Sequence, residues 1–318
     1  MKSKTILIAL LAVIVYVPGF AQAAEPPEPK LTLISNVNIF DGKNEKLHKN
    51  MHVLVKGNQI ETISSEPLAV IQTDNVTIVD GGGRTLMPGL IDAHVHISWV
   101  ISSPYAMFDT TPDYQAALTL AEAEATLMRG FTSVRDTTGQ VFGAKRAIDE
   151  GLFPGPRIWA SGAGISMTSG HGDFRFLSTL PRQMGGPAET EAERIGLIAF
   201  ADGVPEVLTA ARVQMRKGAH FLKMFTSGAV SGLRDPLDIG EFSFDEIKAA
   251  ADEAKRWNTY LAVHTYNDMG TRLALTAGAI VIEHGNLMTE ETMKLAAEKG
   301  AFLSTQTGVF LSTPPADW

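Results

Sequence analysis

The sequence predicts an α/β fold: a TIM-like (β/α) barrel that is incomplete, with about seven of eight strands, and a small N-terminal β portion. Three observations predict it. Apolar strand-like segments alternate with helical stretches after Pro88, which is typical of parallel βαβ units. Short β segments separated by turns precede them, over residues 31–80. A length of 318 residues, 45% of them hydrophobic, suits one large barrel or two ordinary domains with a real core.

The first segment, residues 1–23, is typical of an export signal. Lys2 and Lys4 make it positively charged, Ile6–Val17 is an uninterrupted apolar run, and Ala21-Gln22-Ala23 is a small-residue cleavage site. The apolar run is shorter than the roughly 20 residues that span a bilayer. We therefore expect cleavage after Ala23, an exported periplasmic or secreted protein, and no membrane attachment after cleavage.

The second segment, residues 24–86, is predicted to be a β layer after a proline-rich tail. LTLISNVNIF alternates in polarity, MHVLVKGNQIETI is typical of a hairpin around Lys56-Gly57-Asn58, and VTIVDGGGR closes the set. No side chain in it is assigned a chemical role.

The third segment, residues 87–318, is predicted to be the barrel that carries the chemistry. Its expected strands are Leu90–His96, Thr132–Asp136, Arg157–Gly162, His220–Phe225, Tyr260–His264, Ile280–His284 and Ala301–Thr305. Its expected helices are Ala116–Arg129, Phe142–Glu150, Pro205–Lys217, Phe244–Trp257, Met269–Thr276 and Glu290–Lys299. Residues 163–203 are rich in Gly, Ser and Thr and predict no element, only an insertion over the active face.

Composition limits the chemistry and the partners. The chain has no cysteine, so a bound metal must be held by histidines, carboxylates or a modified side chain. The formal net charge is −8 and no basic patch interrupts the acidic balance, which argues against nucleic acid as a partner. The expected partner is a small-molecule or peptide substrate, and a homo-oligomer is compatible with the sequence.

Two histidines end the first expected barrel strand. Side chains alternate faces along a strand, so Asp92, His94 and His96 share one face. Parallel barrels place active sites at the carboxyl ends of their strands, and two imidazoles on one wall form half of a divalent-metal site. Taken alone, the pair is also compatible with ordinary polar strand residues.

Later strands supply further candidates. His264 ends TYLAVH and His284 ends AIVIEH, so four of the eight histidines lie at three strand ends. A single histidine at a strand end is more often structural, but this grouping favours ligands. Lys223 lies in the apolar strand of AHFLKMF. Its amine is either paired with a nearby acid or carbamylated by carbon dioxide into an anionic ligand that bridges two cations.

Together these residues resemble the amidohydrolase superfamily. PGLIDAHVH, followed by Lys223, His264 and His284 on strands four to six, is similar to its binuclear branch of Xaa-Pro dipeptidase-like and imidazolonepropionase-like members, from about Leu31 to the chain end. The resemblance implies a TIM-like barrel and a β-sandwich built from both chain ends. It implies that His94 and His96 bind one of two divalent ions, with zinc expected. It also implies that His264 and His284 bind the second ion and that carbamylated Lys223 bridges the two.

The resemblance also implies the reaction. It is hydrolysis of an amide bond in a dipeptide or an N-acyl amino acid, by a hydroxide that bridges the metal ions. Members of the superfamily also use an aspartate at the end of strand eight, and the sequence stops before that strand, so the chain resembles a C-terminally truncated enzyme. Asp317 lies in PPADW and is not assigned that role. The alternatives are hydrolysis of cyclic amides or lactones on the same fold, and an inactive fragment that lacks the aspartate.

Three side chains are candidate substrate contacts. His171 in TSGHGD resembles the superfamily's Gly-His-Gly stretch and could act as a catalytic residue that supports the oxyanion, or could cap a turn. Tyr266, two residues after His264, could touch substrate or pack in the core. Arg234 could bind a substrate carboxylate, or pair with Asp235 or Asp238.

Overall fold

The computed structural model describes residues 28–101, 103–232 and 234–306. The predicted export signal and Asp317 lie outside these residues. The chain divides into two compact units, one ending at Pro88 and the other starting at Gly89. None of the helices in the described ranges is both long enough and apolar enough to cross a membrane.

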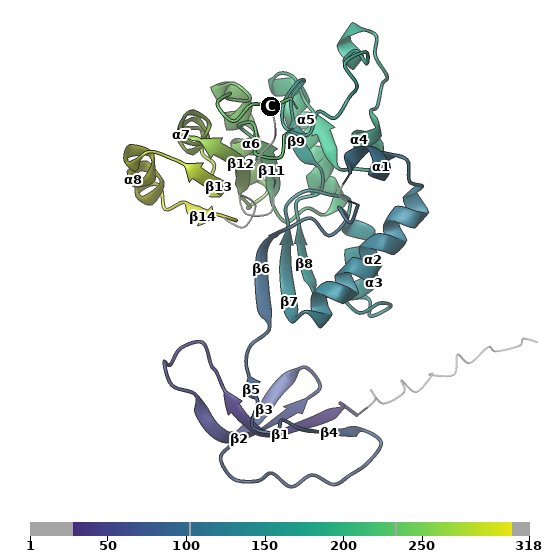
Figure 1. Cartoon of the computed structure of the whole chain (residues 1–318), viewed down its shortest axis with the longest axis vertical. Coiled ribbons are helices and arrows are strands. Elements are labelled where there is room, and N and C mark those ends of the chain that lie inside the picture. The colour runs from purple at the N-terminus through teal and green to yellow at the C-terminus, as the bar shows by residue number, and fades with distance from the viewer. Residues whose placement is uncertain (1–27, 102, 233, 307–318) are drawn as a thin grey trace, which may run out of the picture. The chain divides into compact units, whose positions relative to one another are not determined.

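The first unit is one twisted sheet (Figure 1). Its strands are β1 (Leu31–Ile39), β2 (His48–Lys56), β3 (Gln59–Ser64), β4 (Val76–Asp80) and β5 (Thr85–Leu86). The order is β3-β2-β1-β4, with β5 also on β1. The predicted hairpin is confirmed, because β2 and β3 are antiparallel and Lys56 faces Gln59. The described residues of this unit contain a single sheet, so the second layer of the expected sandwich stays a prediction.

The second unit contains all seven strands that the sequence predicts, in two parallel sheets (Figure 1). The first, three-stranded, is β6 (Leu90–Val95), β7 (Phe131–Asp136) and β8 (Arg157–Ala160). The second, six-stranded, has the order β10 (Ile198–Phe200), β9 (Gly164–Ser166), β11 (Leu222–Phe225), β12 (Leu261–Asn267), β13 (Val281–Leu287) and β14 (Phe302–Ser304). Within the described residues the two sheets are not joined into a closed barrel.

Helices follow the strands as expected. They are α1 (Pro104–Phe108), α2 (Pro112–Met128), α3 (Phe142–Asp149), α4 (Glu191–Arg194), α5 (Val204–Lys217), α6 (Phe244–Arg256), α7 (Asp268–Ala277) and α8 (Glu290–Glu298), with the 3-10 turn η1 (Arg182–Met184). The predicted starts of α6 and α8 are confirmed. The Ser243 backbone N–H donates to the Glu246 carboxylate at 2.8 Å, and the Thr289 hydroxyl accepts from the Thr292 N–H at 3.4 Å.

The expectation of no element between 163 and 203 was wrong. This stretch contains β9 and β10, and β9 joins β10 to β11. Each strand has three residues, which is too short to show the alternation by which strands are found in a sequence. Tertiary contacts form them instead: Ile165 is fully buried, and a side chain at Gly164 would meet the ring of Phe225.

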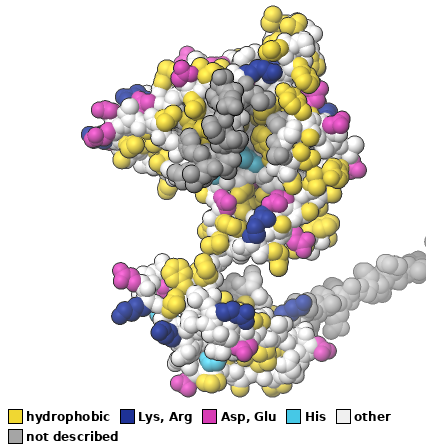
Figure 2. All heavy atoms as spheres, in the orientation of Figure 1, with side chains coloured by type: hydrophobic (Ala, Val, Ile, Leu, Met, Phe, Trp, Pro, Cys, Tyr) yellow, Lys and Arg dark blue, Asp and Glu magenta, His cyan; other side chains and the backbone are white. Residues whose placement is uncertain are grey.

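The main core lies between the six-stranded sheet and the helices that cover it. Leu222, Met224, Val263 and Ile282 from the strands pack with buried alanines and leucines of α5, α6 and α7. This core fixes β11, β12 and β13 side by side, so side chains at their carboxyl ends meet at one edge. On the face that Figure 2 shows, Lys and Arg side chains of the described residues are scattered among acidic ones.

Candidate metal centre

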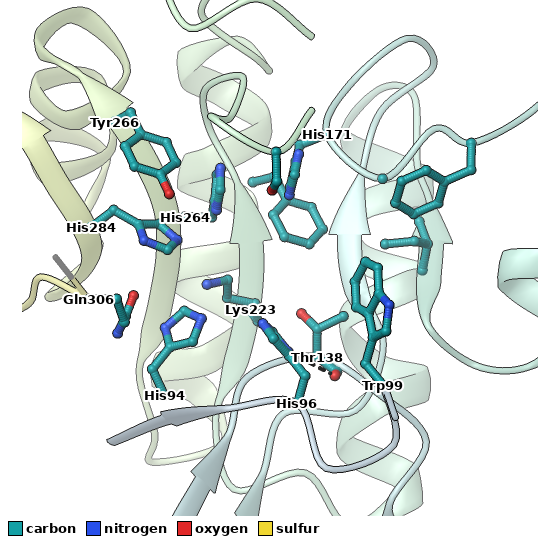
Figure 3. A pocket seen from close by; sticks show the side chains of 15 residues that line it. His94, His96, Trp99, Thr138, His171, Lys223, His264, Tyr266, His284 and Gln306 are labelled. Carbon is teal, nitrogen blue, oxygen red and sulfur yellow. Dashed lines mark hydrogen bonds between the residues drawn. The ribbon is translucent and has the colours of Figure 1, made fainter. Parts of the chain in front are cut away.

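A cavity of about 420 Å³ opens at the carboxyl ends of the parallel strands (Figure 3). All five predicted metal ligands line it: His94, His96, Lys223, His264 and His284. They come from β6 and the residue after it, and from β11, β12 and β13. Segments far apart in sequence therefore bring these side chains to one place, as the strand-end positions predicted.

The four imidazoles converge in a chain of close neighbours. The ring centroids of His94 and His96 are 5.1 Å apart, and those of His264 and His284 are 4.6 Å apart. His94 lies 5.2 Å from His284 and so connects the two pairs. Figure 3 shows the Lys223 side chain pointing into the space between the pairs. This arrangement provides two imidazoles on each side of one amine.

Hydrogen bonds fix the ring orientations of the first pair. The Nδ1 atom of His94 lies 2.8 Å from the Glu283 carboxylate, and Nδ1 of His96 lies 3.2 Å from the carbonyl oxygen of Thr138. When Nδ1 donates its proton to such an acceptor, Nε2 carries the lone pair that binds a metal. Glu283 also accepts from Arg135, so its carboxylate is fixed from two sides.

The second pair, His264 and His284, has buried ring nitrogens that make no hydrogen bond within the described residues. Nε2 of His264 and Nδ1 of His284 are buried without a hydrogen-bond partner among the described residues. A buried polar atom without a partner costs about 1–3 kcal/mol. Coordination of a metal ion would remove that cost. These orphaned nitrogens fit a metal that binds on this side of Lys223.

Burial puts the histidines in the protonation state that metals require. Burial lowers the pKa of His96 to about 3 and that of His284 to about 2, and neighbouring positive charges add to the effect. Burial likewise holds the pKa of His264 well below its usual value. For His94, burial outweighs the opposing hydrogen bond to Glu283, and its pKa is also lowered. Neutral imidazoles are metal ligands, whereas imidazolium ions are not.

Lys223 is the least expected charge in this site. Its side chain is only 1% exposed. Burial, assisted by the positive charge of Arg135 and opposed by Glu283, lowers the pKa of Lys223 to about 7. A large share of the amine is therefore uncharged near neutral pH, and the uncharged amine is the form that reacts with carbon dioxide to give a carbamate.

The histidine pairs by themselves do not make a complete metal site. Among the described residues, no three His, Cys, Asp or Glu side chains are grouped to hold a metal ion by themselves. Two imidazoles lie on each side of Lys223, so a further ligand shared by the two pairs would have to come from that lysine. A metal ion at either pair would therefore need a ligand beyond its two imidazoles, and Lys223 could supply one only without its positive charge.

Sequence reasoning missed Glu283, the carboxylate that orients His94. Alternation along a strand places adjacent residues on opposite faces, but His284 has φ +74°. This left-handed residue in β13 breaks the alternation, so both Glu283 and His284 face the site. Backbone strain of this kind clusters at functional sites. The acidic residue within the apolar AIVIEH run was the available signal.

The structure places two of the three predicted substrate contacts at the cavity. His171 and Tyr266 line the cavity. The ring of His171 stacks on His264 at 4.3 Å, and the ring of Tyr266 stacks on His284 at 4.4 Å. The structure does not bring Arg234 to the cavity: its guanidinium donates to the carbonyl of Arg175 at 2.8 Å. It makes neither the predicted substrate contact nor a side-chain pair with Asp235 or Asp238.

The cavity has an apolar wall that the sequence analysis did not identify. Trp99, Phe174, Ile198 and Phe225 line it. The rings of Trp99 and Phe174 meet edge to face at 5.9 Å, and Trp99 lies 5.9 Å from His96. Aromatic walls beside polar groups bind apolar ligand surface while the polar groups orient it.

Glu241 is a second buried carboxyl beside the cavity. One oxygen accepts from the His171 backbone N–H at 2.7 Å, and the other has no partner among the described residues. Burial raises the pKa of Glu241 from its usual 4.5 to about 8, and the negative charge of Asp235 adds to this. Glu241 is thus protonated in the folded protein near neutral pH and ionised in the unfolded chain.

This difference predicts a pH-dependent stability. The unfolded chain releases the Glu241 proton near pH 4.5 and the folded protein near pH 8, so this residue increasingly favours unfolding as the pH rises between those values. Glu241→Gln removes that penalty. From pH 5 to pH 8 we expect the free energy of unfolding of the variant to gain on the order of 3 kcal/mol over the wild type. Denaturant titrations at both pH values measure it, and an equal difference at both would contradict the assignment.

Residues 85–314 match the family model described as "Amidohydrolase family". The ochratoxinase of Aspergillus niger is 31% identical over 293 residues, which cover 87% of this chain and 59% of that protein. The chain thus spans about three fifths of the length of this relative.

Solved structures agree with the sequence match. A prolidase complexed with N-methylphosphonate-L-proline is 34% identical, with a TM-score of 0.79 over 90% of this chain and 71% of that one. A Xaa-Pro dipeptidase with methionine bound in its active site is 28% identical, with a TM-score of 0.75 over 89% of this chain and 69% of that one. The similarity extends over nearly all of the described fold.

Proposed function

The chain belongs to the amidohydrolase family, and on that premise we propose that it is a metal-dependent hydrolase of amide bonds in dipeptides or N-acyl amino acids. The observation that carries the proposal is the convergence of four neutral imidazoles and one buried lysine at a single cavity. The printed names of two similar structures, a prolidase and a Xaa-Pro dipeptidase, support a dipeptide as the substrate.

The residues suggest how two divalent ions are held. His94 and His96 would bind one ion, His264 and His284 the other, and Lys223 as its carbamate would bridge them. Zinc is the expected ion, because imidazole nitrogens and carboxylate-type oxygens are its usual ligands where thiolates are absent. Divalent ions held there would supply a hydroxide at neutral pH and would polarise the scissile carbonyl.

The protein's own side chains then bind and orient the substrate. His171 lies beside the second imidazole pair and can hydrogen-bond to the carbonyl oxygen on which negative charge develops. The wall of Trp99, Phe174, Ile198 and Phe225 excludes water and accepts an apolar group next to His96. We infer that the preferred substrates carry an apolar or aromatic side chain beside the scissile amide.

A substrate panel tests this function. The full chain, loaded with zinc, is incubated with dipeptides, N-acyl amino acids, lactams and lactones, and products are separated by chromatography. We expect kcat/KM to be highest for a dipeptide or N-acyl amino acid with an apolar side chain. Turnover of lactones or lactams alone, or no turnover by a folded chain that holds two ions, would contradict the proposal.

Trp99→Ala is predicted to weaken binding of large apolar side chains. Loss of the indole removes apolar surface from the wall, and burial of an aromatic group contributes about 1.5–3 kcal/mol. We expect KM for a phenylalanine-containing substrate to rise about tenfold or more, while KM for its alanine counterpart changes by less than about threefold. Steady-state kinetics on the two substrates measure this, and equal increases would contradict the role of the wall.

Export and assembly stay predictions. The signal over residues 1–23 lies outside the described residues, and a homo-oligomer is untested. The export signal is predicted from the sequence alone, and a homo-oligomer is compatible with that sequence.

A further inference from the structure

His171 is fixed by three hydrogen bonds, two of them to residues distant in sequence. Its Nδ1 atom lies 2.7 Å from the Asp235 carboxylate, its backbone N–H donates to Glu241 at 2.7 Å, and its carbonyl accepts from the Ser166 hydroxyl at 2.6 Å. The ring also lies edge to face with Phe225, at 5.0 Å. A loop histidine with this many contacts has one orientation.

The glycines beside His171 make this fit possible. A Cβ atom at Gly170 would lie 2.6 Å from the Glu241 carboxylate, and one at Gly172 would lie 2.6 Å from Ile198. Gly172 also has φ +90°, in the region that disfavours other residues. The Gly-His-Gly stretch is therefore a consequence of packing around the histidine, rather than a sign of a flexible segment.

Asp235 is held in place independently of His171. Only 6% of it is exposed. Its carboxylate also accepts from the backbone N–H groups of Ala229 at 3.1 Å and Arg234 at 3.3 Å. A Cβ atom at Gly232 would lie 2.2 Å from the same carboxylate, so the loop after β11 closes tightly around it. The surroundings provide N–H donors, which require an acceptor at this position.

We propose that Asp235 is a positioning residue for the reaction. By accepting a hydrogen bond from Nδ1 of His171, it holds the ring against His264 and directs the Nε2 edge of the ring into the cavity, toward the substrate. The proposal rests on the proposed amide hydrolysis, to which it adds a residue outside the metal ligands.

Two substitutions of Asp235 distinguish a role in orienting the His171 ring from a role in folding alone. In Asp235→Asn the amide oxygen can still accept from Nδ1 of His171 and from the Ala229 N–H, and the NH₂ group loses only the 3.3 Å hydrogen bond from the Arg234 N–H. In Asp235→Ala the acceptor is lost. We expect Asp235→Ala to lower kcat about 100-fold with KM within about threefold, and Asp235→Asn to retain most of kcat. The matched control is Asp238→Asn, an exposed residue of the same loop, which should behave as wild type.

A double-mutant cycle tests whether Asp235 acts through His171. We expect His171→Ala to lose about as much kcat as Asp235→Ala, and the double variant to lose no more than His171→Ala alone. Losses that multiply, or an Asp235→Ala variant that changes only thermal stability or only KM, would overturn the proposal.

A spectroscopic measurement distinguishes this proposal from the proposed function. In ¹⁵N-histidine spectra of the zinc-loaded chain, His171 should show a protonated Nδ1, and Asp235→Ala should remove that signature. Asp235→Asn, which keeps an acceptor, should preserve it and provides the test if the alanine variant does not fold. A wild type without hydrolase activity would refute the function alone, whereas a His171 protonated only at Nε2 would refute the role of Asp235.

Discussion

Lys223→Met is expected to abolish hydrolysis and to remove most of the bound metal. Methionine matches the length of the lysine stem and cannot form a carbamate, so the ligand that joins the two imidazole pairs is lost. We expect fewer than one ion per chain in place of two, and at least about 1000-fold lower kcat. Elemental analysis and the dipeptide assay measure the two effects.

The metal-free Lys223→Met chain should also be no less stable than the metal-free wild type. Lys223 is 1% exposed, and an amine in such surroundings costs free energy that an apolar side chain does not. An unchanged free energy of unfolding would exclude misfolding as the cause of the lost activity. Lys255→Met, on the exposed face of α6, is the matched control and should keep both ions. Full metal content and full activity in Lys223→Met would contradict the ligand role.

His264→Asn is predicted to have the second largest effect. It removes one of the two imidazoles on its side of Lys223 and leaves the His94–His96 pair intact. We expect the bound metal to fall from two ions to about one per chain and kcat to fall at least about 100-fold.

His48→Asn is the control for this second prediction. His48 lies in the first unit, half exposed beside Asp41, and its loss should change neither value. Two tightly bound ions in His264→Asn would show that its ring is not a ligand. Loss of both ions would show that the His94–His96 pair does not hold its ion without the second histidine pair.

The positions of the candidate ligands could be predicted from sequence because they follow from regular structure. His264, His284 and Lys223 each lie in or at the end of a short apolar run, and the carboxyl ends of parallel strands meet at one edge. Because each of these apolar runs is followed by a helical stretch, the runs could be recognised as parallel strands. Their convergence at one cavity is therefore a consequence of the fold class.

The residues that orient the ligands could not be predicted in the same way. Glu283 meets His94 across 189 positions of sequence, and Asp235 meets His171 across 64. No local pattern encodes such pairs. The left-handed His284 breaks the strand alternation on which the prediction relied, and β9 and β10 are too short to show one. Arg234 was chosen for its charge, but its position in the loop directs it to Arg175.

The most direct test of the central claim is anomalous X-ray diffraction at the zinc edge from crystals of the zinc-loaded full chain. We expect two peaks in the cavity, one bonded to His94 and His96 and one to His264 and His284, with carbamate density on Lys223 in contact with both. No peak within bonding distance of these histidines, or a single peak that leaves Lys223 unmodified and uncoordinated, would contradict it.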